Sequence, residues 1–153
     1  MTLRVGDRVP EFKTKNDQDE IFESSSLIGY TPVVIYFYPK NFTPGCIKEA
    51  CDFRDRYQDF KELGAEIIGI SSDSIKSHEK FKRKYRLPFT FLTDQEGKLR
   101  KLFGVKAGLL GLLPGRETFV VDKRGIVRLR FNSIQASKHT DKALSKVKEI
   151  VQE

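Results

Sequence analysis

The sequence contains few cysteines and histidines. Its cysteines are Cys46 and Cys51, and its histidines are His78 and His139. Two cysteines are too few for the disulfide scaffold of a small secreted domain. They are also too few for a metal site, because neither histidine lies at a ligand spacing from them. We therefore expect neither a bound metal nor another cofactor.

Long apolar segments are absent as well. No apolar run approaches the length needed to cross a bilayer, so we expect no membrane segment. Residues 1–15 are polar and charged and lack the apolar centre of a signal peptide. We expect a cytoplasmic location, or a plastid location if a transit peptide was removed before Met1. In a reducing compartment, cysteines that pair are usually catalytic or redox-sensing.

Nucleic-acid-binding motifs are missing despite a basic composition. The chain has 28 Lys and Arg against 21 Asp and Glu, which gives a net charge of +7. Residues 74–86 carry six of the basic residues and one acid. No zinc-finger, basic-zipper or RNA-binding motif accompanies them, so we interpret this segment as a solvated helix face and expect no nucleic-acid partner.

The pattern of apolar residues predicts an α/β protein. With 153 residues and a 39% apolar fraction, residues 1–153 fit one folded domain. Buried strands are expected where apolar residues cluster, and helices where they recur every three or four positions. The predicted strands are 33–37, 66–70 and 88–92, the predicted helices are 44–63, 74–85, 94–103 and 138–151, and the predicted hairpins are 12–22 and 117–131. This alternation predicts a sheet with both faces covered.

The stretch from Val33 to Cys51 contains a buried strand, a helix start and both cysteines. Its apolar run ends before Pro39, which cannot donate to a strand ladder. Thr43 and Pro44 then form a helix-start signal, as an N-cap followed by proline in the first helical position. Chemistry in α/β sheets usually lies where strands end and helices begin. We therefore expect the site in this loop.

Cys46 is predicted to be the third residue of that helix. The unpaired N–H groups and the positive end of the helix favour a thiolate there. A buried cysteine that only packs in the core is the competing interpretation, and the residues alone leave the two about equal. Cys51 is expected on a different face of the helix, with Lys48 and Glu49 facing water.

The residues around Cys46 carry a family resemblance. Tyr38–Cys46, with Cys51 five positions on, resembles the active-site loop of Q-type peroxiredoxins, also called the bacterioferritin comigratory protein family. Pro39, Thr43 and Cys46 match the motif position by position. The resemblance covers nearly the whole chain and is strongest to cyanobacterial and plastid members. One local departure is Asn41-Phe42, which stands where an acidic pair is often found and makes the rim of the site more apolar.

A later segment extends the resemblance. Leu113–Phe119 is similar to the part of these proteins that supplies an active-site arginine, which maps onto Arg116. The apolar cluster Leu109–Leu113, where this segment begins, is interpreted as core or loop packing, and an apolar rim for a partner or an organic hydroperoxide is the less favoured alternative. The resemblance implies a thioredoxin-like fold, with a central mixed β-sheet flanked by helices on both faces.

The resemblance also implies a reaction. Cys46 would be the peroxidatic cysteine of a thiol-dependent peroxidase that reduces hydrogen peroxide and organic (alkyl) hydroperoxides. Arg116 would serve the thiolate and the peroxide, Thr43 would orient the peroxide, and Pro39 would shield the sulfur. Cys51 would be the resolving cysteine of an atypical 2-Cys mechanism. Thioredoxin or a similar dithiol protein would reduce the disulfide, and we expect a monomer.

Two other functions could use the same pair of cysteines. A thioredoxin-like disulfide reductase is disfavoured, because four residues separate the cysteines where that chemistry uses two. A redox-sensing binding protein that does not turn over, with the basic segment 74–86 as its contact surface, is the non-enzyme alternative. In a regular helix Cys46 and Cys51 would have Cα atoms roughly 8 to 9 Å apart. A disulfide needs about 7 Å or less, so we expect the segment between them to unwind on oxidation.

Overall fold

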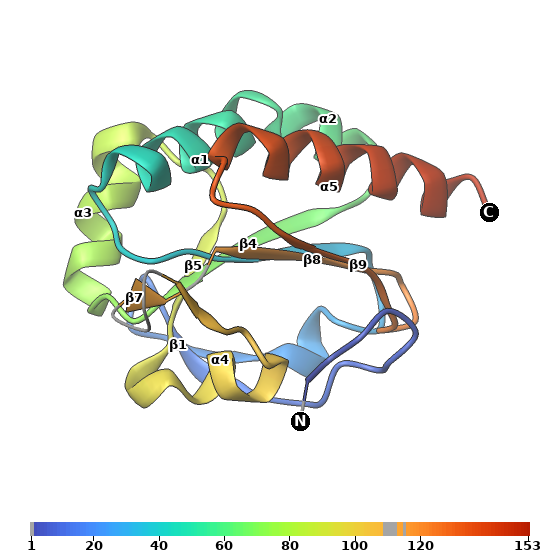
Figure 1. Ribbon diagram of the computed structural model, residues 1–153, viewed down its shortest axis with the longest axis horizontal. Coiled ribbons are helices and arrows are strands. Elements are labelled where there is room, and N and C mark those ends of the chain that lie inside the picture. The colour runs from blue at the N-terminus through green and yellow to red at the C-terminus, as the bar shows by residue number, and fades with distance from the viewer. Residues whose placement is uncertain (1, 109–112, 115) are drawn as a thin grey trace.

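A seven-stranded mixed sheet forms the centre of the computed structural model, which describes residues 2–108, 113–114 and 116–153 (Figure 1). Its strands are β1 (Lys13–Asn16), β2 (Ile21–Glu23), β3 (Val33–Phe37), β4 (Glu66–Ser71), β5 (Thr90–Thr93), β8 (Glu117–Val121) and β9 (Val127–Asn132). They lie in the order β2-β1-β5-β4-β3-β8-β9. A separate short ladder joins β6 (Ala107–Gly108) to β7 (Leu113–Pro114).

The centre of the sheet is parallel and its edges are antiparallel. β4 lies between β3 and β5 and runs parallel to both. The β1–β2 hairpin and the β8–β9 hairpin join this core in antiparallel register. The expected mixed sheet is therefore confirmed. The predicted edge hairpin at 12–22 is confirmed too, because β2 is the outermost strand on its side.

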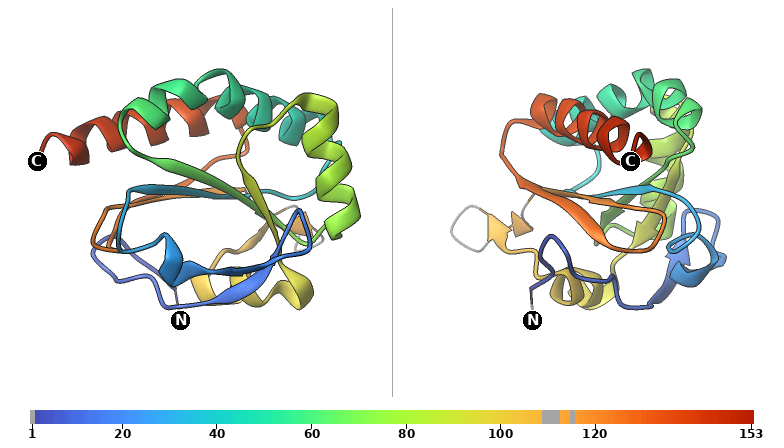
Figure 2. Two further views of the ribbon diagram at one scale, coloured as in Figure 1. Left: turned by 180° about the vertical axis from the view of Figure 1, so that it is seen from behind. Right: turned by 90° about the vertical axis from the view of Figure 1, so that its right-hand side faces the viewer.

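Helices cover both faces of the sheet. They are α1 (Pro44–Asp55), α2 (Tyr57–Glu62), α3 (Ile75–Tyr85), α4 (Lys98–Phe103) and α5 (Ala136–Val151), with 3-10 turns at Ser24–Ser26 and Gln95–Gly97. Figure 1 shows α1, α2 and α5 on one side of the sheet and α4 with the N-terminal segment on the other, and the views of Figure 2 agree. None of the helices among the described residues is long and apolar enough to span a membrane.

The two faces have separate cores because side chains alternate along β3. Val34 and Tyr36 belong to the cluster that includes residues of α1, α2, α3 and α5, whereas Ile35 and Phe37 belong to the cluster on the α4 side. Both kinds of residue are fully buried, as expected for a strand covered on both faces. Phe53 of α1 stacks on Tyr36 with 4.7 Å between ring centroids, which fixes α1 over the sheet.

Two predicted helices differ from the structure. The helix expected over 44–63 is broken at Arg56, whose φ of −105° and ψ of 7° are not helical, so α1 and α2 are separate elements. The helix expected over 94–103 is interrupted before α4, because Glu96 and Gly97 have left-handed φ values of 60° and 69°. Most remaining boundaries differ from the prediction by one or two residues. The Leu109–Leu113 cluster lies mainly outside the described residues.

Candidate active site

The loop between β3 and α1 lies at the end of a central strand. Tyr38 N–H donates to the Ile70 carbonyl at 3.1 Å, which extends the pairing of β3 with β4 by one residue. Pro39 follows, and the ladder ends there because proline has no N–H to donate. Thr43 is extended and occupies the N-cap position of α1, and Pro44 is the first helical residue, as predicted.

The side chain of Thr43 does not cap the helix. Its Oγ1 donates to the Lys40 carbonyl at 2.8 Å, and no helix N–H donates to it among the described residues. The N-cap role predicted for this residue is therefore correct for the backbone and wrong for the side chain. The hydroxyl proton is used within the loop, so its oxygen is left to accept a hydrogen bond.

Cys46 and Arg116 meet at the start of α1. Cys46 is 1% exposed, and its Sγ lies 3.4 Å from Nη2 of Arg116. Arg116 is the residue directly before β8, and β8 pairs with β3 so that Glu117 lies opposite Phe37. Sheet register thus brings the arginine to the loop that carries Cys46. Two residues predicted from distant parts of the sequence are brought together by the fold.

Glu49 completes this cluster, and the expectation that it faces water is wrong. Its side chain is fully buried, and its Oε1 accepts a hydrogen bond from Nη1 of Arg116, whose own side chain is 10% exposed. Burial raises the pKa of Glu49 to about 8, and this effect outweighs the lowering by the guanidinium. Burial lowers the pKa of Arg116, but its contacts with Glu49 and Cys46 together raise it above its ordinary value.

A histidine from α5 lies behind Glu49. Nδ1 of His139 is 2.7 Å from Oγ1 of Thr118 and 3.6 Å from Oε2 of Glu49, and its Nε2 is 2.7 Å from the Ser133 carbonyl. A carbonyl only accepts, so Nε2 carries the proton of the neutral ring and Nδ1 accepts from the Thr118 hydroxyl. Burial lowers the pKa of His139 to about 4, so the ring is neutral at physiological pH.

A second polar network supports the loop from the α3 side. Asn41 is 3% exposed; its N–H donates to Oδ2 of Asp73 at 2.9 Å, and its Oδ1 accepts from the Tyr38 hydroxyl at 2.5 Å. The side-chain nitrogen Nδ2 of Asn41 lies 3.0 Å from Nδ1 of His78. These bonds tie the loop to the start of α3. The backbone before Cys46 is therefore held by β4 through Tyr38 and by the start of α3 through Asn41.

Phe42 forms an aromatic rim beside this loop. It has a φ of +65° and is 42% exposed, and its ring packs against Phe81 at 5.2 Å between centroids and against Tyr85 at 6.4 Å. A positive φ is uncommon for a bulky residue. The aromatic contacts and the anchored Asn41 account for it here, because they fix the backbone on both sides.

Cys51 lies apart from Cys46 in the structure. Both cysteines are free, and Cys51 is half-buried one and a half helical turns further along α1. Burial raises the pKa of the Cys51 thiol, which keeps it protonated at neutral pH. The structure therefore holds the reduced arrangement, with Cys46 at the cluster and Cys51 away from it.

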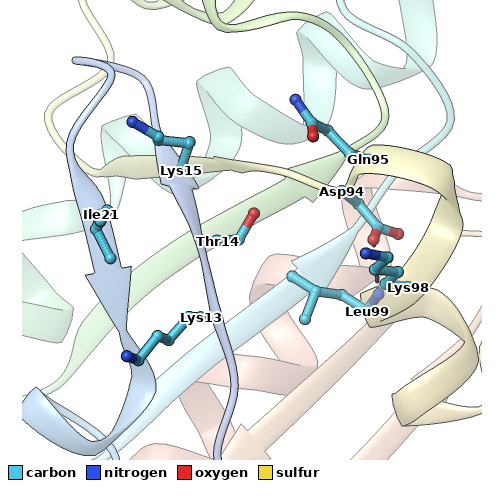
Figure 3. A pocket seen from close by; sticks show the side chains of 8 residues that line it. All are labelled: Lys13, Thr14, Lys15, Ile21, Asp94, Gln95, Lys98 and Leu99. Carbon is cyan, nitrogen blue, oxygen red and sulfur yellow. Dashed lines mark hydrogen bonds between the residues drawn. The ribbon is translucent and has the colours of Figure 1, made fainter.

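Other concave regions lie away from this cluster. The pocket in Figure 3 is lined by residues of the β1–β2 hairpin and the segment after β5, including Thr14, Asp94 and Leu99. Two of its lysines are already paired, Lys13 with Glu23 at 3.2 Å and Lys15 with Asp19 at 3.4 Å. Within the described residues, no group of three or more His, Cys, Asp or Glu side chains is arranged to hold a metal ion.

Sequence reasoning found part of the site. Cys46, Thr43, Arg116 and Pro39 lie on the loop or beside it, whereas Cys51 does not contact Cys46. Local patterns missed the partners that lie behind the cluster. These are Glu49, Thr118 and His139. One signal was present, because a glutamate three residues after Cys46 on the same helix faces the same way as the buried cysteine.

Comparisons with known proteins agree with one another. Residues 5–130 match the model of the AhpC/TSA family. The chain is 51% identical over 143 residues to a chloroplastic peroxiredoxin Q of Populus jackii, covering 93% of this chain and 67% of that protein. It is 50% identical over 140 residues to the chloroplastic peroxiredoxin Q of Sedum lineare, covering 91% and 75%. The chain thus spans about two thirds to three quarters of the length of these relatives.

Solved structures extend the likeness to the fold. The peroxidoxin BcpB of Mycobacterium tuberculosis superimposes with a TM-score of 0.89 and is 38% identical, covering 97% of this chain and 98% of that one. A peroxiredoxin Q of Xanthomonas campestris gives a TM-score of 0.83 and 30% identity, covering 92% and 91%. The thioredoxin-like fold predicted from the resemblance is confirmed by these neighbours.

Proposed function

Since the chain belongs to the AhpC/TSA family and is a thiol-dependent peroxidase of the peroxiredoxin Q type, we propose that Cys46 is the thiol that reacts with the peroxide. The observation that supports this most directly is the 3.4 Å between Sγ of Cys46 and Nη2 of Arg116, at the start of α1. A cation and a helix N-terminus both favour a thiolate, which is the reactive form of cysteine.

The reaction divides the peroxide between sulfur and a leaving group. The Cys46 thiolate attacks one peroxide oxygen, the S–O bond forms as the O–O bond breaks, and the other oxygen leaves as an alkoxide or hydroxide that takes up a proton. Arg116 stabilises the thiolate and the negative charge that develops on the leaving oxygen, because its charge is permanent and its fork has several donors. Thr43 accepts a hydrogen bond from the peroxide, and Pro39 limits the access of water.

The product, a sulfenic acid on Cys46, is resolved by Cys51. The Cys51 sulfur attacks the Cys46 sulfur, a disulfide forms and water leaves. In regular helix the two Cα atoms are roughly 8 to 9 Å apart and their side chains diverge. A disulfide requires about 7 Å or less, so the α1 turns between the two cysteines unwind in this step.

A dithiol protein such as thioredoxin then reduces the disulfide. Hydrogen peroxide and alkyl hydroperoxides are the proposed substrates, and the exposed ring of Phe42 suits the apolar end of the latter. We propose that residues 1–153 work as one domain and as a monomer, without nucleic acid or membrane. The relatives are chloroplastic, which agrees with the plastid alternative for location, whereas a cytoplasmic location stays a prediction.

A coupled assay tests the proposal. Peroxide loss is followed with thioredoxin, thioredoxin reductase and NADPH, in the wild type and in the Cys46→Ser and Cys51→Ser variants. We expect sustained turnover in the wild type and none with Cys46→Ser. With Cys51→Ser we expect one rapid equivalent of peroxide consumed and then little thioredoxin-supported turnover. Sustained turnover of Cys46→Ser would contradict the assignment, and stoichiometric oxidation of the wild type without turnover would favour the redox-sensing alternative.

A further inference from the structure

The segment between the two cysteines carries a buried carboxyl group. Glu49 lies between Cys46 and Cys51 in α1, and its side chain is fully buried. The proposed disulfide requires this segment to unwind, and an unwound segment cannot keep Glu49 in the interior. Each oxidation of the cysteines therefore moves a titratable group from the protein interior into water.

The surroundings of Glu49 come from four parts of the chain. The titratable groups near it are Cys46 and Asp52 of α1, Arg116 before β8, His139 of α5, and Tyr36 and Tyr38 at β3. Apart from Cys46 and Asp52, these groups lie outside the helix that unwinds. They stay in place when Glu49 leaves, and the carboxyl is the buried group whose environment changes most.

The hydrogen bonds around Glu49 distinguish its two oxygens. Oε1 accepts from Arg116, whereas Oε2 is buried and has no hydrogen-bond partner among the described residues. Oε2 instead lies 3.6 Å from Nδ1 of His139, whose lone pair already accepts from Thr118. An ionised Oε2 would place a negative charge against that lone pair. A proton on Oε2 neutralises the carboxyl group and removes that repulsion.

The charges of the cluster also favour a protonated Glu49. Arg116 contacts both Cys46 and Glu49, so one cation serves two groups that are able to become anions. A buried site tolerates a charge only when it is paired, and the active thiol needs the cation for itself. A neutral Glu49 leaves the full charge of Arg116 to the Cys46 thiolate. Burial raises the pKa of Glu49 to about 8, in agreement with this.

We propose that Glu49 holds a proton while α1 is folded and releases it to water when α1 unwinds, so that disulfide formation is linked to proton release. This inference rests on the proposed function, in which Cys46 and Cys51 form the disulfide. Glu49 touches the guanidinium and not the peroxide, so its role is that of a positioning residue with a second, proton-releasing role.

The proton balance makes the proposal measurable. The thiolate of Cys46 and one peroxide give a sulfenic acid and a leaving oxygen that takes one proton from water. Condensation with the Cys51 thiol then gives the disulfide and water, with no further change in free protons. The cysteine chemistry therefore consumes one proton per disulfide. Release from Glu49 returns one, so we expect almost no net uptake in the wild type.

The proton on Glu49 also makes the balance between folded and unwound α1 depend on pH. The pKa of Glu49 is about 8 in the folded helix, and in the unwound segment it returns to the ordinary value of 4.5. The folded form therefore binds the proton more tightly, and rising pH shifts the balance toward the unwound form. Between pH 4.5 and 8 this shift is about tenfold per pH unit, and above pH 8 it ends because the carboxyl is ionised in both forms.

A proton count tests the proposal. Reduced wild type, Glu49→Gln and Asp52→Asn are each mixed with one equivalent of hydrogen peroxide in weakly buffered solution that contains a pH indicator. At about pH 6.5, Glu49→Gln should take up one proton more per disulfide than the wild type. Asp52→Asn is the matched control, because Asp52 is an acid on the same helix whose side chain is partly exposed, and it should behave as the wild type. At about pH 9.5 all three should agree.

Two further measurements keep the outcomes separate. Mass spectrometry of the oxidised products shows whether the Cys46–Cys51 disulfide formed. Equal proton counts with that disulfide present overturn this inference and leave the proposed function intact, whereas a missing disulfide in the wild type overturns both this inference and the resolving role of Cys51. An infrared difference spectrum of the wild type tests the proposal without any variant. Oxidation should remove the band of one protonated carboxyl group, and a band that persists contradicts the proposal even if Glu49→Gln does not fold.

Discussion

Gly45 and Arg116 approach each other so closely that a Cβ atom at position 45 would lie 2.9 Å from Nη2 of Arg116. This Nη2 is the nitrogen that lies 3.4 Å from Sγ of Cys46. Arg116 moves aside only by disturbing its contact with Glu49, because Nη1 donates a hydrogen bond to the buried carboxyl group of Glu49. Position 45 therefore needs a glycine because there is no space for a Cβ atom, whereas its backbone conformation does not require one.

The variant Gly45→Ala should lose much of its activity and little of its stability. The added methyl group displaces the guanidinium from Cys46, and a misplacement of about 1 Å can cost up to a hundredfold in rate. Alanine is the better helix former by roughly 0.5–1 kcal/mol in a helix interior, which offsets part of the cost of moving the guanidinium, so the free energy of unfolding should change little. Initial rates of peroxide reduction and urea unfolding measure the two effects. Lys48→Ala, an exposed change on the same helix, is the control, and equal activity of the two variants would contradict the steric argument.

Replacing Arg116 by lysine should also lower the rate, although the charge is kept. One ammonium group cannot donate to Sγ of Cys46 and Oε1 of Glu49 with the geometry of a planar fork. We expect at least about a tenfold loss in kcat/KM for peroxide and a slower alkylation of Cys46 by iodoacetamide. Arg128→Lys, at a distant ion pair, should keep both rates. Normal rates in Arg116→Lys would mean that charge alone is sufficient.

The strand, loop and helix around Cys46 could be predicted because their signals are local. The apolar run before Pro39 and the Thr43-Pro44 pair act within a few residues, so the sequence shows them directly. The break at Arg56 was not predictable in this way, because the apolar period continues through it from Phe53 to Phe60. The burial of Phe53 and Phe60 is the same on both sides of the break, and so the pattern does not change there.

The partners of Glu49 were not predictable for a different reason. Arg116 and His139 lie 67 and 90 positions away in the sequence, and they reach Glu49 through strand pairing and the packing of α5 against α1. A single sequence without aligned homologues contains no record of such contacts. Arg116 was found through its resemblance to a family motif, and His139 had no motif to mark it.

His139 should make stability depend on pH on the acid side. Its pKa is about 4 when buried and 6.5 ordinarily, so the unfolded chain binds a proton that the folded chain does not. The free energy of unfolding therefore falls as pH drops from 6.5 to 4. Relative to His139→Gln, the wild type should lose about 2 kcal/mol between pH 7 and pH 5 in urea unfolding. Parallel pH profiles of the two proteins would show that His139 is not the group responsible.

Oxidation should unwind only the first part of α1. The segment from Gly45 to Asp52 contains both cysteines, whereas Phe53 is stacked on Tyr36 with 4.7 Å between centroids and Arg54 donates to the Tyr85 carbonyl at 2.8 Å. These contacts anchor the end of α1, and α2 is already a separate element beyond Arg56. If the unwinding stops before Phe53, the stacked aromatic core stays almost unchanged.

Amide hydrogen exchange measures this limit. In the disulfide form, protection should be lost from Gly45 to Asp52 and kept in α2, and thioredoxin should restore the lost protection, because reduction lets the i to i−4 hydrogen bonds form again. Cys51→Ser treated with peroxide is the control, since its Cys46 is oxidised but no intramolecular disulfide can pull on the helix. Loss of protection in that control would make oxidation of Cys46 itself the cause of unwinding. Equal protection in the reduced and disulfide forms would contradict the unwinding altogether, because a regular helix holds the two Cα atoms farther apart than a disulfide allows.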